Sequence, residues 1–168
     1  MMKKHIFLTL LAFVSAACML FFSCKPNPDE EQKKALEGTW VLVEVNGSGF
    51  GSGSPEEAIV FNNGNFEMKE GGTSYAKGTY TVSGTTLTMT LTHFKGSTDI
   101  GLENRWYSKD EVKTIMKRML QENGQTWTAD MDKEIEEDFA PQAVTFSVNG
   151  STLTLIDKDG RTEKYTKK

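Results

Sequence analysis

Few residues of this chain could carry out chemistry, and they do not gather in the sequence. His93 is the only histidine beyond residue 5, whereas metal sites and acyl-transfer triads need several His, Cys or acidic side chains that converge. Asp130, Asp132, Glu134 and Glu136 alternate as in a calcium-binding loop, but the glycine required at the sixth position is missing. Acidic residues at the start of a helix explain this run better. The sequence therefore predicts no catalytic residue, no metal site, no cofactor and no enzyme activity.

A second set of residues is suited to binding, because its members are apolar, aromatic or methionine. Such side chains form adaptable, polarizable surfaces. Packing of one part of the chain on another explains the same residues equally well, so both interpretations stay open. If there is a pocket for a small apolar ligand, its predicted walls are Leu42, Phe66, Met68, Tyr80, Met89, Leu91, Phe146 and Leu155, with Trp106, Met116 and Met119 in a segment that covers it.

Strands must position these residues, and the clearest strand is 85–93. Leu87, Met89, Leu91 and His93 alternate there with threonines. A side-chain period of two predicts a β-strand with a dry face and a threonine-rich wet face. Weaker patterns of the same kind, joined by short turns, predict seven more strands at 38–45, 58–62, 65–69, 74–82, 143–148, 151–157 and 161–166. This order predicts an eight-stranded antiparallel up-and-down β-barrel.

A barrel of this size could lie in water or in an outer membrane. Membrane strands need about 9–11 residues, and several of the predicted strands are nearer five or six. The chain also ends in Tyr-Thr-Lys-Lys, without the terminal aromatic residue usual in membrane barrels. We therefore expect the barrel to lie in water.

The segment from about 95 to 141 interrupts the strand pattern and is too long for a bare loop. Ser108 and Glu111 form a predicted capping box, and apolar residues then recur at helical spacing until Gly124. A second short helix is predicted after Thr128, ending before Pro141. The fold class is therefore all-β with a helical insertion.

The N-terminus reads as an export signal, with Lys3 and Lys4 before an apolar run at 6–22; an uncleaved membrane anchor is the competing interpretation. Small residues followed by cysteine resemble the lipobox of bacterial lipoproteins, in which the cysteine is acylated with fatty acids such as palmitate. Cys24 is the favoured site, because cleavage there leaves a polar, proline-bearing segment, and Cys18 is the alternative. The predicted divisions are a signal peptide at 1–23, a tether at 24–36 and the barrel at 37–168.

Charge and this resemblance set the expected partners and location. Net charge is −4 and becomes −6 when Lys3 and Lys4 leave with the signal peptide, which argues against nucleic acid as a partner. The lipobox implies a bacterial cell envelope protein held on a membrane by its N-terminal lipid. Lys25 differs from the aspartate that retains enterobacterial lipoproteins in the inner membrane, so the outer membrane is favoured. We expect a monomer.

Gly38-Thr39-Trp40 at the start of the first strand resembles the Gly-x-Trp signature of lipocalins, and two Gly-x-Thr-Leu-Thr hairpins, at 84–88 and 150–154, strengthen the likeness to bacterial lipocalin-like lipoproteins. The resemblance implies a calycin-type barrel with Trp40 plugging one end. Pro141-Gln142-Ala143 stands where lipocalins carry Thr-Asp-Tyr, and Arg161 is the one candidate for the arginine that stacks on their tryptophan. The expected function is non-enzymatic binding or carriage of a small apolar ligand. The alternative is an interaction protein, such as a protease inhibitor or a surface adhesin, that acts through the Gly47–Pro55 loop or through the tether.

Overall fold

The computed structural model describes residues 27–49, 54–98 and 102–168. The predicted signal peptide and both candidate lipidation sites, Cys18 and Cys24, lie outside these residues. Within the described ranges, no helix is long and apolar enough to cross a lipid bilayer.

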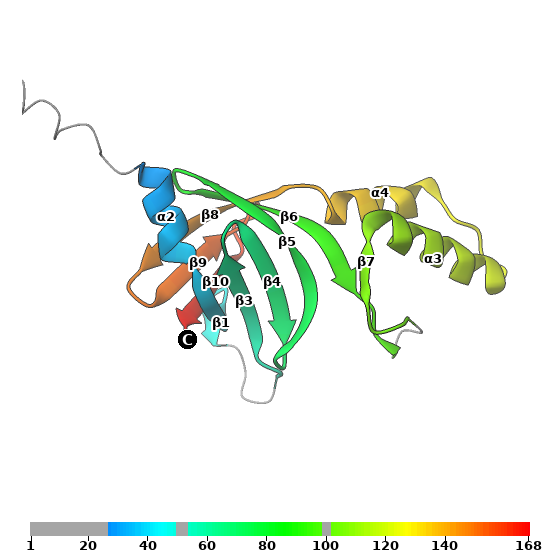
Figure 1. Cartoon of the computed structure of the whole chain (residues 1–168), viewed down its shortest axis with the longest axis horizontal. Coiled ribbons are helices and arrows are strands. Elements are labelled where there is room, and N and C mark those ends of the chain that lie inside the picture. The colour runs from blue at the N-terminus through cyan, green and yellow to red at the C-terminus, as the bar shows by residue number, and fades with distance from the viewer. Residues whose placement is uncertain (1–26, 50–53, 99–101) are drawn as a thin grey trace, which may run out of the picture.

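Eight strands form a closed antiparallel barrel in which each strand pairs with the next, as predicted (Figure 1). The last strand pairs with the first through Trp40–Lys167 and Leu42–Tyr165, so the sheet closes on itself. This is the lipocalin-like, calycin-type architecture expected from the sequence. The eight strands are β1 (Gly38–Val45), β3 (Glu57–Asn62), β4 (Asn65–Glu70), β5 (Thr73–Ser83), β6 (Thr86–Lys95), β8 (Gln142–Asn149), β9 (Thr152–Ile156) and β10 (Thr162–Lys167).

Two further short strands were not predicted. β2 (Ser48–Gly49) pairs with β1, and β7 (Trp106–Ser108) pairs with the end of β6. Both are two or three residues long, too short for side-chain alternation to reveal them in the sequence.

The alternation predicted for the threonine-rich strand holds along most of β6. Leu87 is fully buried, and Met89 packs against the core. A β-bulge then interrupts the pattern, because Gly78 of β5 pairs with Leu91 whereas Lys77 pairs with His93. The extra residue turns His93 to the outer surface, so the prediction that His93 shares a face with Leu91 is wrong.

Gly78 is required at this bulge because there is no room for a side chain. A Cβ atom at this position would overlap the carbonyl oxygen of Thr90 and the ring of Phe66. The absence of a Cβ therefore allows β5 and β6 to approach each other and leaves room for the Phe66 ring beside Gly78.

A helix closes one end of the barrel. α2 (Pro28–Leu36) lies within the segment expected to be a tether, and two carboxylates at its ends hold it to barrel turns. Asp29 accepts a hydrogen bond from the Gly84 N–H (2.8 Å), and Glu37 accepts one from the Asn63 N–H (2.8 Å). Both turns lie between consecutive strands, so α2 is fixed to this end of the barrel.

Trp40 plugs the same end, as its position in the lipocalin-like signature implies. Trp40 and Leu36 are fully buried, and the indole N–H donates to the Leu36 carbonyl oxygen at 2.6 Å. The Lys167 ammonium lies 5.0 Å from the centre of the Trp40 ring. Lys167, not Arg161, therefore makes the cation–π contact with this tryptophan; Arg161 forms an ion pair with Glu163 instead.

The insertion forms the two predicted helices, α3 (Lys109–Glu122) and α4 (Ala129–Asp138). They lie together beyond β6 and β7, on the side of the barrel away from α2 (Figure 1). Lys113 of α3 joins the two helices, because its ammonium contacts Asp132 at 3.1 Å and Glu136 at 2.5 Å.

Replacing Trp40 by alanine should lower the free energy of unfolding by about 3–5 kcal/mol, because a fully buried aromatic side chain leaves a cavity when it is removed. Urea denaturation followed by circular dichroism measures the change. Trp106→Ala is the matched control: this tryptophan lies on the outer surface, and we expect a loss of about 1 kcal/mol or less. Equal losses in the two variants would contradict the assigned role of Trp40.

Candidate functional site

The barrel wall is incomplete between β6 and β8. The two strands pair only from Thr86 to Met89 on β6, and β7 pairs with β6 again from His93. Neither β7 nor β8 pairs with residues 90–92 of β6. The insertion, which contains β7, α3 and α4, connects β6 to β8 beside this gap. At one end of the gap β7 leads directly into α3, and at the other end α4 leads into β8.

An apolar cavity of about 750 Å³ lies at this gap, within the range of about 300–1,000 Å³ that is usual for small-molecule sites. Strands β4, β5 and β6 form one part of its wall, and helices α3 and α4 form another. The lining residues are Phe66, Met68, Tyr75, Ala76, Met89, Leu91, Phe94, Val112, Met116, Leu120, Met131, Glu134, Ile135, Asp138, Phe139 and Gln142.

A second apolar cavity of about 370 Å³ adjoins the first under α3. Phe94, Val112, Met116 and Leu120 line both cavities. The second cavity extends between α3 and β7, where Tyr107 is buried. Together the two spaces make an elongated apolar site that runs from the barrel interior along the inner side of α3.

The structure brings together about half of the predicted pocket residues. Phe66, Met68, Met89, Leu91 and Met116 line the larger cavity, and Met119 lines the smaller one. The other predicted wall residues lie deeper, in the packed core of the barrel: Leu42, Tyr80, Phe146 and Leu155.

Trp106 does not face either cavity. Its backbone pairs with Lys95, and its ring lies on the outer surface of the barrel with the Lys77 ammonium 4.5 Å from its centre. His93 lies on the same surface, where its Nδ1 is 3.0 Å from the Thr92 hydroxyl oxygen. The β-bulge in β6 separates these two residues from the apolar interior.

Several lining residues were not in the predicted wall. Ala76 and Tyr75 lie next to a second β-bulge, between β4 and β5, which no sequence pattern indicates. Val112, Leu120 and Ile135 carry the helical apolar spacing, so that signal was present, but the direction in which the helices pack was needed to place them in the site. The lining also contains two carboxylates, Glu134 and Asp138. In the sequence they indicated only a charged helix and not a place in a binding site.

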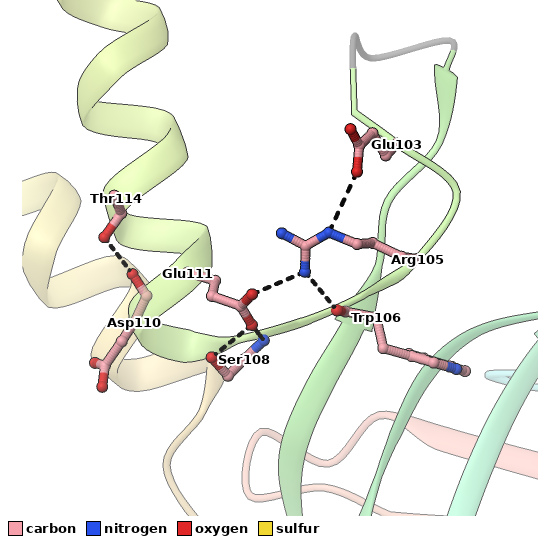
Figure 2. Close-up of polar contacts among 7 residues, drawn as sticks. All are labelled: Glu103, Arg105, Trp106, Ser108, Asp110, Glu111 and Thr114. Carbon is pink, nitrogen blue, oxygen red and sulfur yellow. Dashed lines mark hydrogen bonds and ion pairs between the residues drawn. The ribbon is translucent and has the colours of Figure 1, made fainter.

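The start of α3 is fixed by one carboxylate that accepts several hydrogen bonds (Figure 2). Glu111 accepts from the Ser108 backbone N–H and from the Ser108 hydroxyl, both at 2.9 Å, and from Arg105 at 2.8 Å. The capping box predicted here is therefore formed. The Ser108 backbone N–H, followed by the Arg105 side chain and the Ser108 hydroxyl, lowers the pKa of Glu111 from 4.5 to about 2.

Arg105 continues this network toward β7. Its guanidinium donates to the Trp106 carbonyl oxygen at 3.2 Å and lies 3.5 Å from Glu103 (Figure 2). The same group stacks on Tyr107, 3.9 Å from the ring centre. Because Tyr107 lines the smaller cavity, Arg105 links the start of α3 to the wall of the site.

Charged contacts hold α4 against α3. Lys109 contacts Glu136 at 2.7 Å, next to the Lys113 contacts described above. Lys109, and then Lys113, lowers the pKa of Glu136 to about 2. Gln142 at the start of β8 donates to the Glu137 carbonyl oxygen at 2.9 Å, so the end of α4 is tied to the barrel.

The lining of the larger cavity is mostly apolar. Among the residues that the structure describes, no group of three or more His, Cys, Asp or Glu side chains is placed to hold a metal ion. The lining offers apolar contact, the Tyr75 ring and two carboxylates. The Gly47–Pro55 loop, the alternative site of interaction, includes residues 50–53, which lie outside the described residues.

Comparison with protein families and with curated proteins finds no match for this chain. Among solved structures, it is similar to an uncharacterized protein from Bacteroides eggerthii, whose crystal structure was determined at 2.60 Å resolution. The two are 15% identical, with a TM-score of 0.44, over 79% of this chain and 99% of that one. We draw no functional conclusion from a likeness this weak.

Acid should loosen the start of α3. The pKa of Glu111 lies below its ordinary value of 4.5, so its contribution to the helix is complete above about pH 4.5 and is lost as the pH falls toward 2. The Ser108 amide proton in an NMR titration should report this change, with a midpoint near pH 2.

The variant Glu111→Gln serves as the control for this titration, because it should abolish the transition at Ser108 and leave the amide of buried Leu87 unaffected. A Ser108 transition centred near pH 4.5 in the unchanged protein would show that Glu111 does not carry the proposed hydrogen bonds.

Proposed function

We propose that this protein is a lipid-anchored lipoprotein of a bacterial envelope that binds or carries a small apolar ligand in its lipocalin-like barrel. The observation that carries the proposal is the apolar cavity of about 750 Å³ at the gap between β6 and β8. Its lining combines phenylalanine rings with the side chains of Met68, Met89, Met116 and Met131, which adapt to varied ligand shapes.

The packing of the closed end of the barrel, which differs from that of the cavity, supports the same proposal. Trp40 and Leu36 are fully buried at that end, and the apolar cavity lies at the other side, beneath α3 and α4. A ligand that enters beneath the helices would bury apolar surface, which stabilises the complex by about 25 cal/mol for each Å² removed from water. Met116, which is 41% exposed, would be covered by such a ligand.

The role proposed for the N-terminus rests on the sequence. Acylation of Cys24 would place the lipid only four residues before Pro28, where α2 begins. Because α2 is hydrogen-bonded to the barrel, the anchor would hold the closed end near the membrane, and the cavity would lie on the far side. We place the protein at the outer membrane, as a non-enzymatic monomer.

Filling the cavity should abolish ligand binding while the barrel remains folded. Ala76 is buried on β5 and lines the cavity, so the side chain in Ala76→Trp should occupy the ligand's space. We expect native mass spectra of the full-length chain, isolated from bacterial membranes, to show an apolar adduct that this variant lacks.

Ala143→Trp is the matched control, because Ala143 is exposed on β8 and pairs with Thr88 of β6. This variant should keep the adduct. Circular dichroism establishes that both variants retain the barrel, and Leu91→Trp replaces Ala76→Trp if the latter does not fold. An unchanged adduct in a folded cavity-filled variant, or no adduct in the native protein, would count against ligand binding in this cavity.

Lipidation should depend on Cys24. In cells supplied with radiolabelled palmitate, Cys24→Ala should lose both the label and membrane association, because it removes the thiol that would be acylated. Cys18→Ala should retain both. The reverse pattern would move the lipidation site to Cys18, and retention in both variants would contradict the lipoprotein assignment.

A further inference from the structure

The acidic residues of α4 fall into two sets that differ in what neutralises them. Asp132 and Glu136 face α3, where Lys109 and Lys113 pair with them. Glu134 and Asp138 face the cavity, and in the described part of the chain neither side chain has an ion pair or a hydrogen bond. The helix pair therefore neutralises the acids between its helices and leaves those at the cavity uncompensated.

Glu134 and Asp138 are also four residues apart on one helix, so their like charges repel each other. Among the described residues that line the cavity, there is no lysine, arginine or histidine that could offset them. The barrel residues in the lining are apolar except for Tyr75 and Gln142. A ligand head group at this place would meet two negative charges, both exposed to water at the edge of an apolar space.

A second pair of like charges lies on the paired strands β3 and β4. Glu57 of β3 and Glu70 of β4 are directly opposite each other in the sheet, an arrangement that is unfavourable without a cation. No ion pair of either residue is found within the described ranges. Burial, followed by the nearby carboxylates of Glu57, Glu70 and Glu163, raises the pKa of Tyr75, which lines the cavity.

Building on the function proposed above, we propose that the ligand is a single-chain amphiphile with a cationic ammonium head group. Its apolar chain would lie in the cavity, and its head group would lie beside Glu134 and Asp138. The rings of Phe139 and Tyr75 also line the cavity, and aromatic faces attract ammonium groups through cation–π interactions. A fatty-acid carboxylate of the same length would be repelled by the same residues.

Competition among three ligands of equal chain length tests this proposal. The full-length chain in phosphatidylcholine nanodiscs is mixed with dodecyltrimethylammonium, dodecanol and dodecanoate, and native mass spectrometry measures each adduct. The readout is the ratio of ammonium adduct to alcohol adduct, compared between variants in identical discs, so that partition into the disc and ionisation efficiency cancel.

In Glu134→Gln/Asp138→Asn we expect this ratio to fall about two- to tenfold, the size expected for two charge pairs that remain exposed to water, and the dodecanoate adduct to rise. Glu122→Gln/Glu137→Gln is the control. It also removes two negative charges, one from α3 and one from α4, at exposed positions that do not line the cavity, and the ratio should stay unchanged.

Failure of this inference can be told apart from failure of the proposed function. If dodecanol binds but the ratio is the same in the cavity variant and the native chain, the cavity takes apolar ligands without selecting a cation, and this inference is overturned. An equal fall in the control variant overturns it too, because net charge alone would then explain the selectivity. If dodecanol gives no adduct, apolar binding itself is refuted.

Discussion

β6 exchanges hydrogen bonds with β8 over four residue pairs, and then the two strands separate. A barrel of eight strands has an interior just wide enough for its own side chains or for one small ligand. The separation after Met89 lets the interior open sideways beneath α3 and α4, so that side chains on β4, β5 and β6 meet side chains from the helices. The cavity exists because the sheet does not close along its whole length.

The two ends of the barrel differ in packing. At one end the interior is packed by Trp40 and Leu36, and hydrogen bonds fix α2 over it. Closely packed apolar side chains make this part of the core rigid. At the other end methionine and phenylalanine side chains line an open space. This division lets the closed end stabilise the fold while the open end remains available for a ligand.

The charged side chains of the insertion also fall into two groups, those that hold the helices in place and those that face the cavity. Lys109 and Lys113 hold α4 against α3 by pairing with Asp132 and Glu136, and Arg105 joins Glu111 to β7. These contacts are exposed and contribute little energy one by one, but together they orient the helices over the cavity. The carboxylates that face the cavity have no such partners among the residues that the structure describes, so the electrostatic character of the site is decided by how α4 is rotated.

The sequence by itself determined the strands, the two helices and the closed barrel, because side-chain alternation, turn residues and the capping box are local signals. The same periodicities put Phe66, Met68, Met89, Leu91 and Met116 on inward faces, but they did not separate residues that line a pocket from residues that pack the core. Only the tertiary structure decided that His93 and Trp106 face outward and that Glu134 and Asp138 face the cavity. The position of a bulge depends on the partner strand, and the face that a helix turns toward the cavity depends on the element it packs against. The local sequence therefore predicts neither.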